Sequence, residues 1–140
     1  MISTILCATR GGEASVRTQM RAIELARERG ASLLFLYVAD VRFLDRLSGT
    51  MVVDVATELE HMGEFLLLMA KERAEKAGVE AATVVKRGEF RDALVSAAQE
   101  AEASLIVLGS PEEGGHTQRD FLEALAASIS EECGIETIIV

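Results

Sequence analysis

Four short apolar runs of the sequence are each followed by glycine, a hydroxyl group or a charged side chain. These segments are Thr9-Arg10-Gly11-Gly12, Val38-Ala39-Asp40, Lys86-Arg87-Gly88 and Gly109-Ser110. A glycine lets a ligand approach the backbone closely, and the N-terminus of a following helix favours an anion. An arginine at the same place could hold a phosphate or carboxylate through its planar donor fork. Together the segments predict binding of a small anion, although any one glycine alone could simply turn the chain.

Other polar groupings that look like metal or catalytic sites have simpler interpretations. Glu58, His61 and Glu64 are spaced by three residues, which would place them on one helical face where they could hold a metal. No second such motif completes a two-metal site, so we interpret them as a solvated face and expect no metal. Ser110 and His116 lack the Gly-x-Ser-x-Gly pattern of a hydrolase. No catalytic residue is predicted, which favours a non-enzymatic protein.

The charge balance argues against several classes of partner. The 140 residues carry 23 acidic and 14 basic side chains, a formal net charge of −9. Nucleic acids and anionic membranes require a positive surface, so neither is an expected partner. The apolar runs are far shorter than the roughly twenty residues of a transmembrane helix, and no signal peptide is visible. Cys7 and Cys133 are expected to be free thiols, with Cys7 inert inside a strand. We therefore expect a cytoplasmic protein with no direct membrane insertion.

Apolar runs and helical patterns alternate along the whole chain. The expected strands cover residues 5–8, 32–38, 80–86, 104–108 and 137–140. The expected helices lie between residues 16 and 30, 55 and 78, 90 and 101, and 117 and 134. The stretch from Asp40 to Val53 has no clear period and is expected to be a loop. This alternation predicts an α/β fold, in which residues 1–140 form a single domain around a parallel sheet with helices on both faces.

Apolar residues spaced by three or four positions predict which face of each helix is buried. The stripes are Val16, Met20 and Ile23 in the first helix, Val55, Leu59, Met62, Leu66 and Met69 in the second, and Phe121, Leu125, Ile129 and Cys133 in the last. Met62 and Met69 are accordingly expected in the core rather than in a cofactor pocket.

The order of these motifs resembles that of the universal stress protein family. The segment Ile5 to Ser15 resembles the family's opening strand, which usually leads into Thr-Asp-Gly-Ser-Glu, and Gly30 to Val38 is similar to its second strand. Arg87-Gly88-Glu89 and the run from Ser104 to Ser110 match its third and fourth strand exits. The resemblance spans the chain. It implies a five-stranded parallel sheet with strand order 3-2-1-4-5, Rossmann-like and of the adenine nucleotide alpha hydrolase kind.

One branch of this family binds ATP through Gly-x-x-Gly, nine residues, then Gly-Ser or Gly-Thr after strand four. By this resemblance the first glycine is Gly109, whereas Glu112 and Glu123-Ala124 stand at later required positions. Gly114 and Gly115 could serve instead in a longer loop. Glu123 would repel triphosphate oxygens, so weak ATP binding is expected.

The residue after Thr9 is a second departure from the family pattern. Arg10 replaces the usual acid, which could bind ribose hydroxyls. Arg10 could instead bind an anionic ligand, or it could pair with a nearby acid on the surface. The residues expected to line the ligand site are Ala8, Thr9, Arg10, Val38, Asp40, Gly88, Gly109, Ser110, Gly114 and Gly115.

The last strand is expected to form a homodimer through Ile138, Ile139 and Val140, where the family places its dimer-forming edge. The first functional hypothesis is a non-enzymatic stress-response module that dimerises and binds a small anionic or nucleotide ligand, with ATP or AMP as possible cofactors and neither required. A nucleotide-gated switch with slow ATP hydrolysis is the second hypothesis. The third is a cytoplasmic regulatory domain associated with a membrane transporter.

Overall fold

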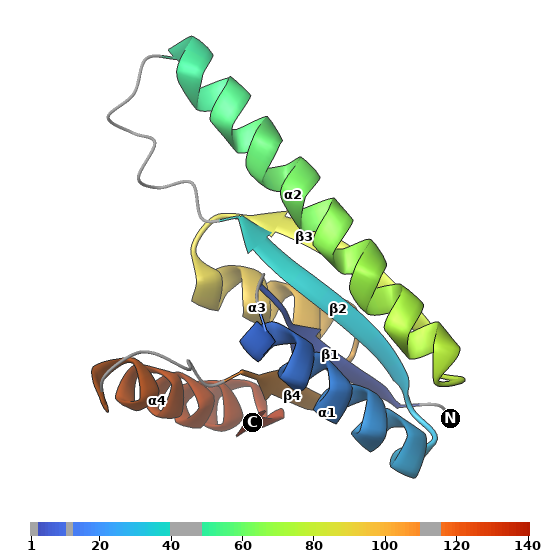
Figure 1. Ribbon diagram of the computed structural model, residues 1–140. Coiled ribbons are helices and arrows are strands. Elements are labelled where there is room, and N and C mark those ends of the chain that lie inside the picture. The colour runs from blue at the N-terminus through green and yellow to red at the C-terminus, as the bar shows by residue number, and fades with distance from the viewer. Residues whose placement is uncertain (1–2, 11–12, 40–48, 110–115) are drawn as a thin grey trace.

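The computed structural model describes residues 3–10, 13–39, 49–109 and 116–140. Within these residues, strands and helices alternate strictly along the chain (Figure 1). The elements are β1 (Thr4–Ala8), α1 (Glu13–Arg29), β2 (Ser32–Ala39), α2 (Gly49–Lys76), β3 (Ala81–Arg87), α3 (Phe90–Glu100), β4 (Leu105–Leu108), α4 (His116–Cys133) and β5 (Glu136–Ile139). The predicted strands are confirmed, with ends that differ by about one residue, the usual uncertainty of such boundaries.

The five strands form one parallel sheet in the order β3-β2-β1-β4-β5. Central strand β1 sets the register, since Cys7 lies opposite Phe35 of β2 on one side and Val107 of β4 on the other. Ile5, Leu6 and Cys7 at its centre are fully buried because both edges and both faces of β1 are covered. The parallel sheet and the strand order expected from the sequence are therefore confirmed.

Two pairs of helices cover the two faces of the sheet (Figure 1). Alternate residues of each strand point to opposite faces. Cys7 and Phe35 pack with residues of α1 and α2, whereas Leu6 and Leu36 pack with residues of α3 and α4. The sheet thus separates two apolar cores, and the prediction of helices on both faces is confirmed.

Helix α2 begins earlier than the sequence predicts. It starts at Gly49, so residues 49–53 are helical rather than part of a loop. The lack of an apolar period misled the prediction, because a helix extends through backbone hydrogen bonds that require no apolar stripe. Figure 1 shows this end of α2 rising beyond the sheet. In the part of the chain that the structure describes, no helix is both long and apolar enough to cross a membrane.

The face of α2 that packs on the sheet is not the one predicted. Met62 and Met69 are 53% and 38% exposed, so their assignment to the core is wrong. The sheet-facing side carries mainly small residues: Ala56, Gly63, Leu67, Ala70 and Ala74. A Cβ atom on Gly63 would lie 2.3 Å from the Tyr37 ring. Small residues let the helix lie close to β2, and the large apolar side chains are left on the outside.

Helix α4 shows a smaller difference of the same kind. Leu125 and Ile129 are buried as predicted, but Phe121 is 61% exposed. Leu122 packs against the core in its place. The buried stripe therefore runs through residues 122, 125 and 129, a spacing of three and four that also fits one helical face.

Candidate functional site

The candidate site lies where β1 and β4 end side by side. Cys7 pairs with Val107, so Ala8 and Thr9 leave the sheet next to Leu108 and Gly109. From β1 the chain continues to β2, toward one edge of the sheet, and from β4 it continues to β5, toward the other edge. The strand order therefore reverses between β1 and β4. Ligands of open parallel sheets bind at such a reversal, beyond the carboxyl ends of the strands.

Thr9 is held in place by a buried chain of hydrogen bonds from two helices. Its backbone N–H donates to the Leu36 carbonyl at 2.8 Å. Gln19 of α1 donates from Nε2 to Thr9 Oγ1 at 2.6 Å, and Arg73 of α2 donates from Nη1 to Gln19 Oε1 at 2.8 Å. Thr9 and Gln19 are each 3% exposed. Thr9 therefore fixes the carboxyl end of β1 from the side that α1 and α2 cover. The residues beside Thr9 are the ones that can contact a ligand.

The sequence analysis did not identify Gln19 or Arg73. The helical pattern placed Met20 on the inner face of α1, but Met20 is 51% exposed and Gln19 is buried in its place. Hydrophobic periodicity cannot detect a polar side chain that is buried because a distant residue satisfies it. Arg73 lies 54 positions further along the chain, so no local pattern connects the two.

Gly109 lies in close contact with α1 at the end of β4. A Cβ atom there would lie 2.4 Å from Thr18 Oγ1, which donates to the Ala14 carbonyl at 3.0 Å. Gly109 therefore does more than turn the chain: it allows α1 to lie against the strand exit. Gly88, by contrast, has a φ of 117°, and its N–H donates to the Ala39 carbonyl at 3.1 Å. Its role is the turn after β3.

Two arginines at this edge of the sheet differ in their surroundings. Arg87 of β3 is paired with Glu60 of α2, and this guanidinium lowers the pKa of Glu60. Arg10 is exposed, and its backbone N–H donates to Ser15 Oγ at 3.0 Å. Among the described residues, no side-chain hydrogen bond or ion pair involves the Arg10 guanidinium. The surface ion pair considered for Arg10 is thus not found there, and the cation faces solvent beside the β1 exit.

The remaining predicted site residues divide into two groups. Ala8 and Val38 are half-buried at the ends of β1 and β2. Asp40, Ser110, Gly114 and Gly115 lie outside the described residues, as does Glu112.

The other polar candidates that the structure describes are a buried thiol and an exposed helix face. Cys7 is fully buried, and burial raises the pKa of its thiol to about 12, so it is inert at neutral pH as predicted. Glu58, His61 and Glu64 are all exposed, in agreement with a solvated helix face. The described residues contain no group of three His, Cys, Asp or Glu side chains that could hold a metal ion.

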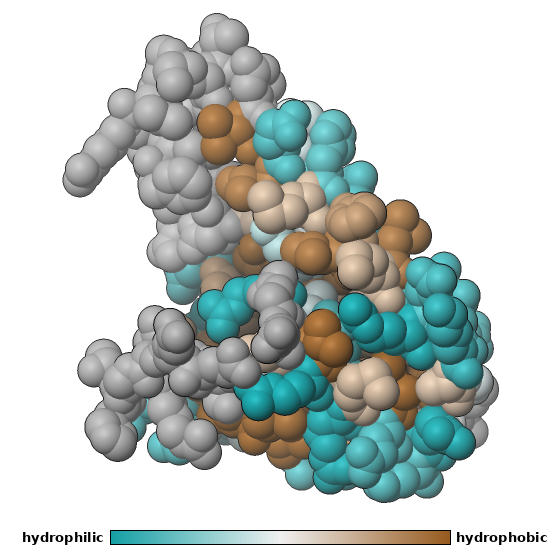
Figure 2. Space-filling model, viewed as in Figure 1, coloured by the Kyte–Doolittle hydropathy of each residue, from teal (hydrophilic) through white to brown (hydrophobic). Residues whose placement is uncertain are grey.

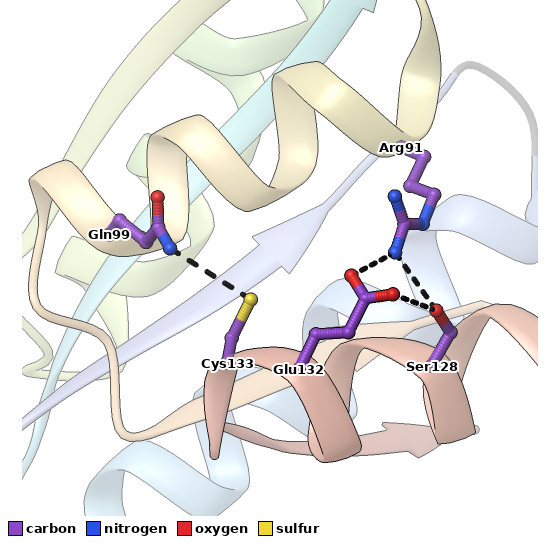
Figure 3. Close-up of polar contacts among 5 residues, drawn as sticks. All are labelled: Arg91, Gln99, Ser128, Glu132 and Cys133. Atoms are coloured by element: carbon purple, nitrogen blue, oxygen red, sulfur yellow. Dashed lines mark hydrogen bonds and ion pairs between the residues drawn. The ribbon is translucent and has the colours of Figure 1, made fainter.

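On the face of the sheet that α3 and α4 cover, a polar network joins these two helices (Figure 3). Arg91 of α3 donates from Nη2 to Ser128 Oγ at 2.9 Å and also forms an ion pair with Glu132. Gln99 donates to Cys133 Sγ at 3.9 Å. These contacts hold α4, which follows the exit of β4, against a helix that is itself packed on the sheet.

The comparisons with known proteins identify the family. The model of the universal stress protein family matches residues 1–140. The chain belongs to the universal stress protein family. A universal stress protein of Bacillus subtilis (strain 168), YxiE, is 31% identical in an alignment of 118 residues that covers 79% of this chain and 80% of that one.

Solved universal stress proteins share the fold. One, in complex with cAMP, has a TM-score of 0.72 and 24% identity, covering 99% of this chain and 96% of its own. Another, from Archaeoglobus fulgidus in complex with dAMP, has a TM-score of 0.63 and 18% identity, covering 99% and 97%. At these identities the likeness establishes the Rossmann-like α/β fold of this chain.

Proposed function

We propose that this universal stress protein is a non-enzymatic regulatory module of the cytoplasm that binds an adenine nucleotide carrying a single phosphate. The nucleotide binds at the carboxyl ends of β1 and β4, beside Ala8, Thr9, Arg10 and Gly109. ATP binds weakly there. The module acts as a homodimer through β5. The module acts by binding this ligand and does not convert it chemically.

The exposed guanidinium of Arg10 is the observation that carries this proposal. In a chain with a net charge of −9, a cation without a partner among the described residues is available for an anionic ligand. Its backbone is fixed through Ser15 Oγ, and the preceding residue is fixed through Gln19. The guanidinium that extends from this fixed backbone can donate two parallel hydrogen bonds to one phosphate group.

Two relatives of the same fold support a nucleotide with one phosphate. The solved universal stress proteins described above are complexes with cAMP and dAMP, and each of these ligands carries one phosphate. Weak ATP binding is supported by Glu123, which is exposed near the start of α4 where the ATP-binding pattern has glycine. A carboxylate near the β- and γ-phosphates would repel them.

Isothermal titration of the purified protein with AMP and with Mg-ATP tests the proposal. We expect AMP to bind at least tenfold more tightly than ATP. Arg10→Ala should weaken AMP binding about tenfold, since a charge-assisted hydrogen bond contributes roughly 1.5–3 kcal/mol and tenfold corresponds to about 1.4 kcal/mol. Arg29→Ala, which removes the same charge at the far end of α1, should leave AMP binding unchanged.

A second variant tests the phosphate end of the site. Glu123→Gly combined with Ala124→Ser should strengthen ATP binding and leave AMP binding unaffected. Equal or tighter binding of ATP by the wild-type protein would contradict the proposal and favour a nucleotide-gated switch. Failure of both nucleotides to bind would also contradict the proposal.

A further inference from the structure

The outward face of α2 carries four large apolar side chains that the fold leaves in solvent. Met62, Phe65, Leu68 and Met69 are 53%, 63%, 62% and 38% exposed, and we call them the α2 outer patch. Spacings of three and four residues place them on one side of the helix, opposite the side that packs on the sheet. Figure 2 shows apolar surface along α2. An apolar group of this kind commonly marks an interaction site.

The patch has two parts that follow one another along the helix. Its N-terminal part borders a shallow groove of about 500 Å³, lined by Val55, Glu58, Leu59, His61, Met62 and Phe65. Its C-terminal part consists of Leu68 and Met69, which lie about one turn beyond the groove on the same face. A groove and a protrusion on one helix are the elements that a twofold interface requires, because each copy can then fill the groove of the other.

We propose that the α2 outer patch binds the same patch of a second copy of this chain, with the two helices antiparallel and the twofold axis near Phe65. The groove is centred near residue 60 and the protrusion near residue 68, so the midpoint between them falls at residues 64–65. Leu68 and Met69 of each copy then enter the groove of the other, and the two Phe65 rings meet at the axis.

The charge distribution along α2 favours this orientation. Glu58 and Glu64 are exposed in residues 55–65, which contain no lysine or arginine, while Glu60 is paired with Arg87 of β3. In residues 66–76, Lys71 and Lys76 pair with Glu75 and Glu72 along the helix, and Arg73 donates to Gln19 of α1. Antiparallel pairing therefore places the acidic half of each helix opposite a half of balanced charge, whereas parallel pairing would place the two acidic halves together. The two exposed glutamates also disfavour an anionic membrane as the occupant.

This interface is separate from the one proposed for β5. Helix α2 packs on β2 and β3, and β3 and β5 are the opposite edges of the sheet. The two contacts can therefore form together, and a chain that uses both would assemble beyond the dimer. Substitutions at one contact should leave the other intact, so the two proposals can be tested independently.

Sedimentation velocity over a range of concentrations tests the α2 interface. Phe65→Glu should weaken self-association at least tenfold, alone and in an Ile139→Lys background that removes the β5 contact. Phe121→Glu is the matched control, because Phe121 is 61% exposed and lies on α4, against the other face of the sheet. Since Phe65 faces solvent in the monomer, thermal unfolding should show that Phe65→Glu folds normally.

Cysteine cross-linking in a Cys133→Ser background tests the antiparallel arrangement. Phe65→Cys should form an intermolecular disulfide readily, because the two residues meet at the axis. Lys76→Cys should not, since the two positions would lie roughly 33 Å apart at 1.5 Å per residue, far beyond the Cα separation of about 7 Å that a disulfide permits. An Ile139→Lys protein that stays monomeric at all concentrations, no effect of Phe65→Glu, or efficient cross-linking through Lys76→Cys would each overturn the proposal.

Discussion

Gly109 is limited to glycine by a single contact with Thr18, and this contact can be tested directly. A Cβ atom at Gly109 would overlap Thr18 Oγ1 at 2.4 Å. Gly109→Ala should therefore destabilise the fold by roughly 1–3 kcal/mol, the usual cost of overpacking. Thr18→Ala removes the hydroxyl that clashes and should restore most of this loss in the double variant. Denaturant unfolding of the four proteins forms a double-mutant cycle, and strictly additive effects would contradict the contact.

At the level of residues, the sequence predicted the positions at strand ends better than the side chains that hold them. Arg10 and Gly109 could be identified because residues that follow a strand share one edge of a parallel sheet, whatever their contacts. Gln19 could not, because its burial depends on Thr9 and Arg73, which lie on other elements. A buried polar residue is explained only by its partners, and those are brought together by the fold.

At the level of elements, β5 offers the edge at which a dimer is expected. It pairs only with β4, leaving its other edge unpaired within the described residues, and Val140 after it is 37% exposed. Ile139→Lys places a charge on this edge and should shift dimers joined through β5 toward monomers. Because Ile139 also packs on the core beneath α3 and α4, thermal unfolding must confirm that the variant is folded. An unchanged association constant in sedimentation experiments would place the dimer contact elsewhere.

Helix α2 shows why periodicity can predict a helix and yet assign the wrong face. The stripe through Met62 and Met69 correctly indicates a helix, since its spacing is helical. Burial is decided by the distance between helix and sheet, and residues such as Gly63 and Ala70 permit the closest approach. The large apolar side chains of α2 therefore lie on its outer side, away from the sheet. A second stripe, of small residues, was the signal that could have revealed the inner face.

At the level of the whole molecule, two ion pairs predict how stability depends on pH. Arg87 lowers the pKa of Glu60, and Lys86 lowers that of Glu100, so β3 is linked to both α2 and α3. A carboxylate whose pKa is lower in the folded state contributes stability that is present above its unfolded pKa, about 4.3, and lost as the pH falls through the folded value. Stability should accordingly decline below about pH 4.3.

Urea unfolding between pH 7 and pH 3 measures this effect. Glu60→Gln combined with Glu100→Gln should flatten the decline while changing stability little at neutral pH, because Glu100 is exposed and Glu60 partly exposed, so that solvent screens both ion pairs. Glu131→Gln is the control, as Glu131 is exposed and forms no ion pair within the described residues. An acid profile unchanged in the double variant would show that other carboxylates dominate.

The close contact between Gly63 and Tyr37 lets the intrinsic fluorescence of the protein report on the position of α2. The chain contains one tyrosine and no tryptophan, so its intrinsic fluorescence comes almost entirely from a single ring. That ring lies on β2 directly under α2. Any event that lifts or tilts the helix changes the environment of this fluorophore, whereas rearrangements on the far face of the sheet leave it untouched. Emission from Tyr37 thus reports how closely α2 packs on the sheet, and it requires no added label.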